Sequence, residues 1–119
     1  MSENVYWVFE LAVNPGRLED LKTLSAEMID ATQRNDQGTL NYEWAISDDL
    51  RVCHIYERFQ DSAAVVAHVR SFGAHFAARF TEILKPIRLV VYGAPNEQVK
   101  DALAGLNPIF MPAFGGFRR

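Results

Sequence analysis

The sequence lacks the features that mark export, membrane insertion and disulfide-bonded folds. One cysteine among 119 residues cannot form a disulfide within the chain, so we expect a cytoplasmic protein. No stretch approaches the ~20 consecutive apolar residues of a membrane-spanning helix, so no membrane partner is expected. The opening residues MSENVYWVFE also lack the basic start and long apolar run of a signal peptide.

Positive charge and cofactor-binding motifs are also scarce. Twelve Lys and Arg residues against 15 Asp and Glu residues give a net charge of −3, with no basic stripe. Nucleic acid is therefore not an expected partner. The glycine-rich motif GxGxxG is absent, and no dense cluster of metal-ligating residues occurs, so we expect no cofactor and no bound metal.

The residues that are present predict one domain of alternating strands and helices. Stretches rich in β-branched and aromatic residues predict strands at 5–13, 39–47, 51–59 and 86–93. A first helix is expected to begin with Asn14 as its cap and Pro15 in its first position, and a second to follow Asp61 and break at Gly73. The order β-α-β-β-α-β is that of the ferredoxin-like α+β fold, in which an antiparallel sheet carries helices on one face only.

The other face of this sheet is predicted to be rich in aromatic residues. Alternation along the strands is expected to place on it Tyr6, Val8, Tyr42, Trp44, His54 and Tyr56. Soluble monomers seldom expose such a surface. We therefore expect a second copy of the chain to cover it in a homodimer.

The C-terminal part of the chain is expected to add to this unit without forming a separate domain. Residues 1–93 are expected to form the ferredoxin-like unit, and residues 94–119 a short helix and an extended tail. The tail NPIFMPAFGGFRR is rich in phenylalanine, and its prolines prevent a regular helix. We expect it to pack along the dimer seam or against the sheet edge of the second copy, and to help close the pocket.

Several segments resemble the antibiotic biosynthesis monooxygenase family over about residues 5–92. They are NPG after the first strand, GTLNYEW in the second, and YERFQDSAAVVAHVRSFGAHF from the third strand into the second helix. The resemblance implies a dimeric α+β barrel. Characterised relatives oxidise phenolic or quinol-type aromatics with O2 and need no flavin, haem or metal, because the deprotonated substrate supplies the electrons. Haem-degrading relatives typically carry Asn and Trp where this chain has Phe9 and Phe59, which argues against haem.

Glu57 and His68 are the expected catalytic residues. Glu57 shares a strand face with Ile55 and Phe59, which the helices should cover, and a buried carboxylate suits a general base or a hydrogen-bond anchor. His68 lies on the inward stripe of the second helix, close to the end of that strand. The pair could form a base and its orienter, or a structural pair within the core.

The remaining candidates would bind the substrate. We expect Asn41 and Glu43 to orient its oxygen substituents, and His75 to lie at the rim of the pocket. Aromatic side chains expected to hold the ring are Phe59, Phe72 and Phe76.

Two histidines have open roles. His54 lies on the expected dimer face, where it would carry protons or pair with Glu10. A metal pair of His68 and His75 has no third ligand at a fixed spacing, which makes it a weak zinc signal.

The sequence thus favours a cofactor-independent monooxygenase that oxidises a small aromatic phenol or quinol with O2. The alternatives are a non-catalytic module that binds a small molecule, and an isomerase on the same fold.

Overall fold

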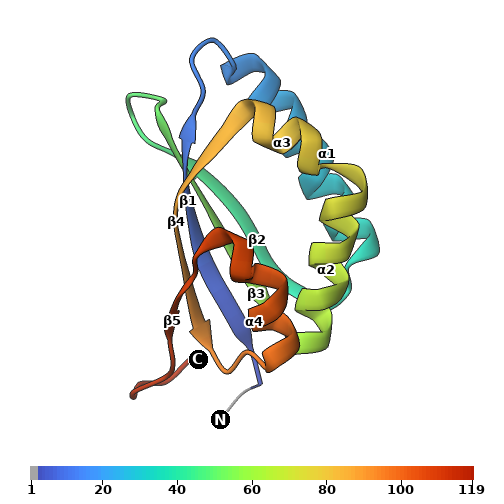
Figure 1. Cartoon of the computed structure of the whole chain (residues 1–119), viewed down its shortest axis with the longest axis vertical. Coiled ribbons are helices and arrows are strands. Elements are labelled where there is room, and N and C mark those ends of the chain that lie inside the picture. Colours follow the sequence, from blue (N-terminus) through green and yellow to red (C-terminus); the bar gives the residue numbers. More distant parts are fainter. Residues whose placement is uncertain (1–2) are drawn as a thin grey trace.

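A computed structural model describes residues 3–119 as one layer of helices on one face of a sheet. The strands are β1 (Val5–Val13), β2 (Thr39–Ile46), β3 (Val52–Phe59), β4 (Leu84–Gly93) and β5 (Ile109–Met111). The helices are α1 (Leu18–Asn35), α2 (Ser62–His75), α3 (Ala77–Ile83) and α4 (Glu97–Leu103), with a 3₁₀ turn, η1, at Ala104–Leu106. Figure 1 shows α1, α2 and α3 along one side of the sheet.

The sheet has the order β2-β3-β1-β4-β5. Its first four strands are antiparallel neighbours, as the ferredoxin-like pattern predicts. The fifth strand, β5, runs parallel to β4 at the sheet edge, pairing Ile109 with Val90 and Met111 with Tyr92. The sheet is therefore mixed, and the first part of the expected tail is its edge strand.

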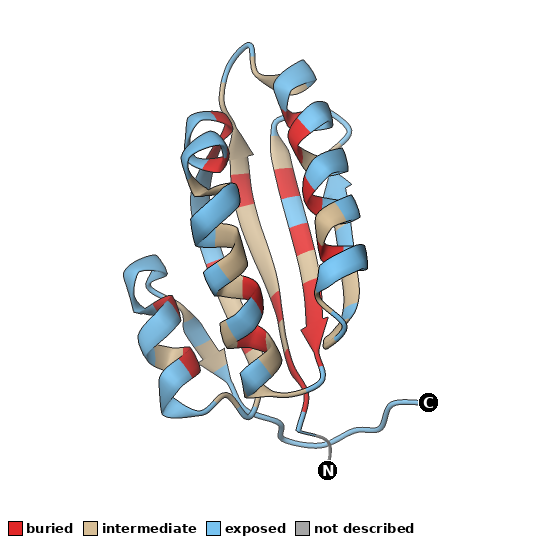
Figure 2. Ribbon diagram, turned by 90° about the vertical axis from the view of Figure 1, so that its right-hand side faces the viewer, coloured by how far each residue is buried: buried red, intermediate tan, exposed pale blue. Residues whose placement is uncertain are grey.

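The core fills the space between the sheet and the helices, and Figure 2 shows buried residues on the helix surfaces that face the sheet. One group of buried side chains joins α1 and α3 to the sheet and contains Leu11, Leu21, Leu24, Met28, Cys53, Ile55, Phe80, Ile83 and Leu84. A second joins α2 and α4 to it and contains Val5, Trp7, Phe59, Val65, Leu89, Val91, Val99 and Leu103. Both groups follow the 3.6-residue and two-residue periods of helix and strand.

The start of α1 differs from the sequence-based prediction. Asn14 and Pro15 belong to a turn, and the helix begins at Leu18. Gly16 has φ +76, in the left-handed region that interrupts a helix. Asn14 serves a different purpose, because its Nδ2 donates a hydrogen bond to the carbonyl of Glu82 at 2.9 Å.

The start of α2 follows the prediction and its end does not. Asp61 caps the helix by accepting a hydrogen bond from the amide of Ala64 at 2.9 Å. The helix runs through Gly73 and ends at His75. A single glycine in a helix costs only about 0.5–1 kcal/mol relative to alanine, too little to end a helix that packs well.

The prediction that Tyr42 and Trp44 lie on the outer face of the sheet was wrong. Tyr42 pairs with Glu57 and Trp44 with Ile55, and both aromatics pack against the core below the helices. Strand alternation shows that Tyr42 and Trp44 share a face, but it does not say which face the helices cover. The outer face instead carries Tyr6, Val8, His54, Tyr56 and Tyr92.

Candidate active site

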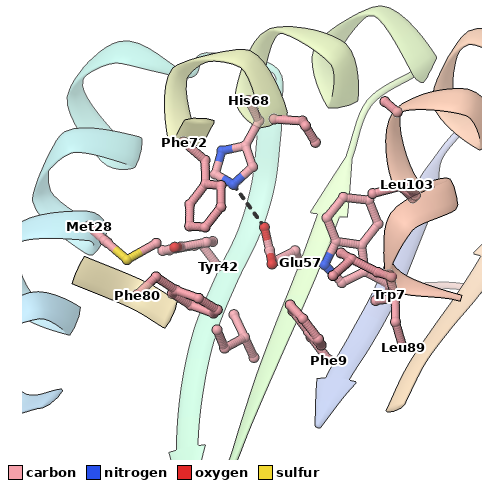
Figure 3. Close-up of a pocket in the computed structure, with 14 residues that line it drawn as sticks. Trp7, Phe9, Met28, Tyr42, Glu57, His68, Phe72, Phe80, Leu89 and Leu103 are labelled. Carbon is pink, nitrogen blue, oxygen red and sulfur yellow. Dashed lines mark hydrogen bonds and ion pairs between the residues drawn. The ribbon is translucent and has the colours of Figure 1, made fainter. Parts of the chain in front are cut away.

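A cavity of about 260 Å³ lies between the sheet and the helices, with both predicted catalytic residues in its wall. Glu57 reaches it from β3 and His68 from α2 (Figure 3). The lining is otherwise almost wholly apolar: Trp7, Phe9, Met28, Tyr42, Ile55, Val69, Phe72, Phe80, Leu89, Ala102, Leu103 and Leu106. Such a cavity matches the lower end of the size range of small-molecule sites, roughly 300 Å³.

Glu57 is the polar centre of this cavity. Its side chain is buried, and Oε2 accepts a hydrogen bond from the indole Nε1 of Trp7 at 2.8 Å. Nε2 of His68 lies 3.0 Å from the other oxygen, Oε1. This contact is an ion pair whose geometry departs from that of a good hydrogen bond. A carboxylate oxygen has more than one acceptor site, so Oε1 can also accept a hydrogen bond from a ligand.

His68 connects Glu57 to a second carboxylate, Asp36. Nδ1 of His68 lies 2.8 Å from Oδ2 of Asp36, in the segment that follows α1. Burial by itself lowers the pKa of His68, but the hydrogen bonds and charges of Glu57 and Asp36 outweigh burial and raise this pKa above its ordinary value. The imidazole is thereby held in one orientation between the two carboxylates and favoured in its charged form.

Tyr42 supplies a neutral hydroxyl in the cavity wall. Its ring meets that of His68 edge-on, with the ring centroids 5.6 Å apart. Burial, and then the nearby charge of Glu57, raise the pKa of Tyr42 above its ordinary value. The phenol therefore keeps its proton and can donate a hydrogen bond to a ligand oxygen.

The predicted aromatic residues occupy different layers around the cavity. Phe72 lies in its wall. Phe59 is fully buried beneath His68, with the ring centroids 5.3 Å apart, so it supports the histidine without lining the cavity. Phe76 packs against the core at the edge of a separate small depression near Asp36.

Three predicted substrate-binding residues lie away from the cavity of this chain. Asn41 and Glu43 pair with Arg58 and Tyr56 on the outer face of the sheet, because β2 turns Tyr42 inward. His75 is exposed at the end of α2, where its Nδ1 lies 2.9 Å from the carbonyl of Ser71. His54 is also on the outer face, with Nε2 3.3 Å from Glu10 within the same chain.

Sequence reasoning missed Asp36 and the contribution of the C-terminal segment. Asp36 lies 32 residues from His68 in a polar stretch that resembles an ordinary helix end, so its only local signal was a carboxylate after a helix. Ala102, Leu103 and Leu106 were not expected in the cavity wall.

In residues 3–119, no three His, Cys, Asp or Glu side chains are grouped to hold a metal ion. No helix in this range is both long and apolar enough to span a membrane.

Solved structures of other proteins share the fold of this chain. MupZ from Pseudomonas fluorescens has a similar structure, with a TM-score of 0.88 and 21% identity over 100% of this chain and 91% of that protein. Rv0793 from Mycobacterium tuberculosis matches with a TM-score of 0.67 and 24% identity over 79% of this chain and 97% of that protein. These identities establish the shared fold alone. No curated protein has a significant match to this sequence.

The match to a family model is more specific. Residues 4–82 match the model described as antibiotic biosynthesis monooxygenase, which is well over half of the chain and includes both Glu57 and His68. The chain therefore belongs to the antibiotic biosynthesis monooxygenase family.

Proposed function

We propose that this protein oxidises a small phenolic or quinol-type aromatic with O2, without a bound cofactor, and that Glu57 is its general base. The observation that supports this most strongly is the carboxylate itself. Glu57 is buried in an apolar cavity, and its Oε1, which lies 3.0 Å from Nε2 of His68, has room to accept a second donor. A ligand hydroxyl would supply that donor.

The surroundings of Glu57 suit proton removal from a weak acid. Trp7 fixes one carboxylate oxygen and His68, oriented by Asp36, faces the other. A general base must lie within hydrogen-bond reach of the proton that it removes. A phenol whose ring packs against Phe72 and Phe80 would place its hydroxyl beside Glu57 (Figure 3).

The reaction would consume one O2 per substrate and release one water. Oε1 of Glu57 takes the phenol proton, and the resulting phenolate transfers electrons to O2. A carbon–oxygen bond forms at a ring carbon that carries hydrogen, and the peroxide formed takes up a proton from Glu57. Loss of water from this hydroperoxide leaves a ring carbonyl, so one oxygen atom enters the product and the other leaves as water. The apolar wall limits side reactions of the phenolate with solvent.

Oxygen uptake with a set of phenols, naphthols and quinols tests this function. The wild type should consume O2 and form the corresponding quinone. Glu57→Gln should lower turnover at least ~100-fold, as expected for loss of a general base, and still bind the substrate. Glu19→Gln, an exposed glutamate on α1, is the matched control and should behave as the wild type. Full turnover in Glu57→Gln would exclude the assigned role, and bound phenols without O2 uptake would exclude the oxidation.

The contact between His68 and Glu57 also favours a second candidate, an isomerase. Two groups that carry protons lie 3.0 Å apart, so one could remove a proton from a substrate and the other could return it elsewhere. An isomerase would convert its substrate equally well under argon, whereas the proposed oxidation would stop.

A further inference from the structure

The cavity has two chemically different ends, with Glu57 between them. In Figure 3, Tyr42, Phe72 and Phe80 lie on one side of the carboxylate, and Trp7, Leu89 and Leu103 lie on the other. We call the first side the aromatic end and the second the aliphatic end. Because Glu57 lies between the two ends, a ligand whose hydroxyl binds Glu57 can extend into either end.

The aromatic end is closed and has fixed walls. The ring of Phe72 meets that of Phe80 edge-on, with the ring centroids 5.1 Å apart, and Phe9 stacks on Phe80 at 6.1 Å. Met28 and Phe80 are both buried. Flat faces held in this way suit a planar ring and leave little room for a substituent pointing further inward.

The aliphatic end is built from a different part of the chain. Apart from the indole of Trp7, whose Nε1 donates to Glu57, its walls come from Val69 of α2, Leu89 of β4, and Ala102, Leu103 and Leu106 of α4 and η1. Ala102 and Leu106 are exposed, whereas the other lining residues are buried or half-buried, so the cavity opens beside α4 and η1. None of these five side chains has a polar group, so this end cannot satisfy a polar substituent.

The segment that carries the aliphatic end is firmly attached. Val99 and Leu103 are buried against the sheet, and Asn96 caps α4 by accepting a hydrogen bond from the amide of Val99 at 3.0 Å. The amide of Asn96 donates to Oγ of Ser62 at the start of α2, at 3.0 Å. Helix α4 and the turn η1 lie beyond position 82, where the match to the family model ends. The part of the aliphatic end that they form therefore lies outside the matched segment.

We propose that the aliphatic end is a subsite for an alkyl substituent next to the hydroxyl of the ligand. This inference rests on the proposed function, because it takes the hydroxyl to bind Glu57 and the ring to occupy the aromatic end. A substituent ortho to the hydroxyl then points across Glu57 towards Leu103 and the opening. A para substituent points into the closed aromatic end. The ligand class is thus an ortho-alkylated phenol, and residues 102–106 determine how long the alkyl group can be.

Calorimetric titration with simple alkylphenols tests the subsite without requiring turnover. In the ortho series from phenol to pentylphenol, affinity should rise roughly three- to fourfold for each methylene buried. The para series should show no such gain. Equal gains in both series would overturn the proposed orientation.

Two tryptophan substitutions form a matched pair for this test. Ala102→Trp should fill the subsite and abolish the gain for ortho-pentylphenol, with the affinity for phenol itself changed by no more than about twofold. Ala104→Trp is two residues away and equally exposed, and Ala104 does not line the cavity, so this variant should bind the whole series as the wild type does. An unchanged chain-length dependence in Ala102→Trp would exclude the subsite.

Pentylbenzene, which has no hydroxyl, separates this inference from the proposed function. If pentylbenzene binds in a manner blocked by Ala102→Trp while phenols gain nothing from their hydroxyl, the subsite stands and the role of Glu57 fails. If phenols bind through Glu57 with no effect of chain length, the role of Glu57 stands and the subsite is wrong.

Discussion

The two ring nitrogens of His68 face the carboxylates of Glu57 and Asp36, and the ring of Tyr42 meets the imidazole ring edge-on. The raised pKa of His68 means that the folded protein favours the imidazolium form more than the unfolded chain does. The resulting contribution to stability is fully present below the unfolded pKa of about 6.5. It is lost as the pH rises through the higher folded pKa.

The first prediction follows from the upward shift of the pKa of His68. The difference in unfolding free energy between wild type and His68→Gln should be larger at about pH 6 than at about pH 9, because the contribution of the raised pKa declines as the pH rises through the folded pKa. Chemical denaturation at the two pH values measures this difference.

Asp36→Asn should lower the pKa of His68, observed by NMR of the imidazole ring, because one of the two carboxylates that raise it is gone. A pKa of His68 unchanged in Asp36→Asn would contradict the assigned pairing.

The sequence could indicate Glu57 and His68 but not the full chain of contacts. A carboxylate on an inward strand face and a histidine on an inward helix stripe are local patterns. The contact of His68 with Asp36 depends on how the end of α1 approaches α2, and local periodicity does not encode that approach. The indole of Trp7 similarly appears in the sequence as ordinary core, and only pairing of β1 with β3 brings it to Glu57.

Among the elements, the residue just before β2 lies close to the start of α2. A Cβ added at Gly38 would lie 2.5 Å from Cβ of Ala64, near the start of the helix that carries His68. The second prediction is that Gly38→Ala destabilises the protein by roughly 1–3 kcal/mol, because the helix must shift to avoid the clash. Thermal and chemical denaturation measure this loss.

Gly73, inside α2, has free space around it where Gly38 has none. A Cβ added there meets nothing within 4 Å, and the residue lies inside α2. Gly73→Ala should therefore stabilise the protein by about 0.5–1 kcal/mol, as expected for a helix-interior glycine. Similar stability changes for the two variants would show that the approach of Gly38 to Ala64 does not constrain α2.

Element order was predictable, whereas the orientation of β2 and the exact helix ends were not. Each strand shows a two-residue period, and this period gave the correct partition of side chains into two faces. The inward orientation of Tyr42 and Trp44 arises from pairing with Glu57 and Ile55, and tertiary packing determines this pairing. The left-handed turn at Gly16 likewise overrides a strong local signal for a helix start at Asn14.

For the whole molecule, the outer face of the sheet is the main feature that the single chain leaves uncovered. Tyr6 stacks on Tyr92 with ring centroids 5.3 Å apart, and the guanidinium of Arg58 lies 3.9 Å from the centroid of Tyr6. Val8 lies at the centre of this face, paired with Tyr56 and Val90. Beyond β5, Phe114 and Phe117 are also exposed, at 107% and 81%. Within residues 3–119 the helix layer covers only the other face, and Tyr6, Val8, Tyr56 and Tyr92 remain partly exposed on this one.

The last prediction is that two copies associate through this face, as we propose from the corrected set of outward residues. Size-exclusion chromatography with light scattering at micromolar concentration should give about twice the chain mass of 13.5 kDa. Val8→Glu should weaken the association, because a carboxylate buried without a partner is costly. Ile29→Glu places the same charge on an exposed position of α1, in the helix layer, and should leave the mass unchanged. Trp44 would not serve as a test position, because its ring packs below the helices and a charge there would disturb folding. A wild-type protein that remains a monomer under these conditions would contradict the proposed association through the sheet.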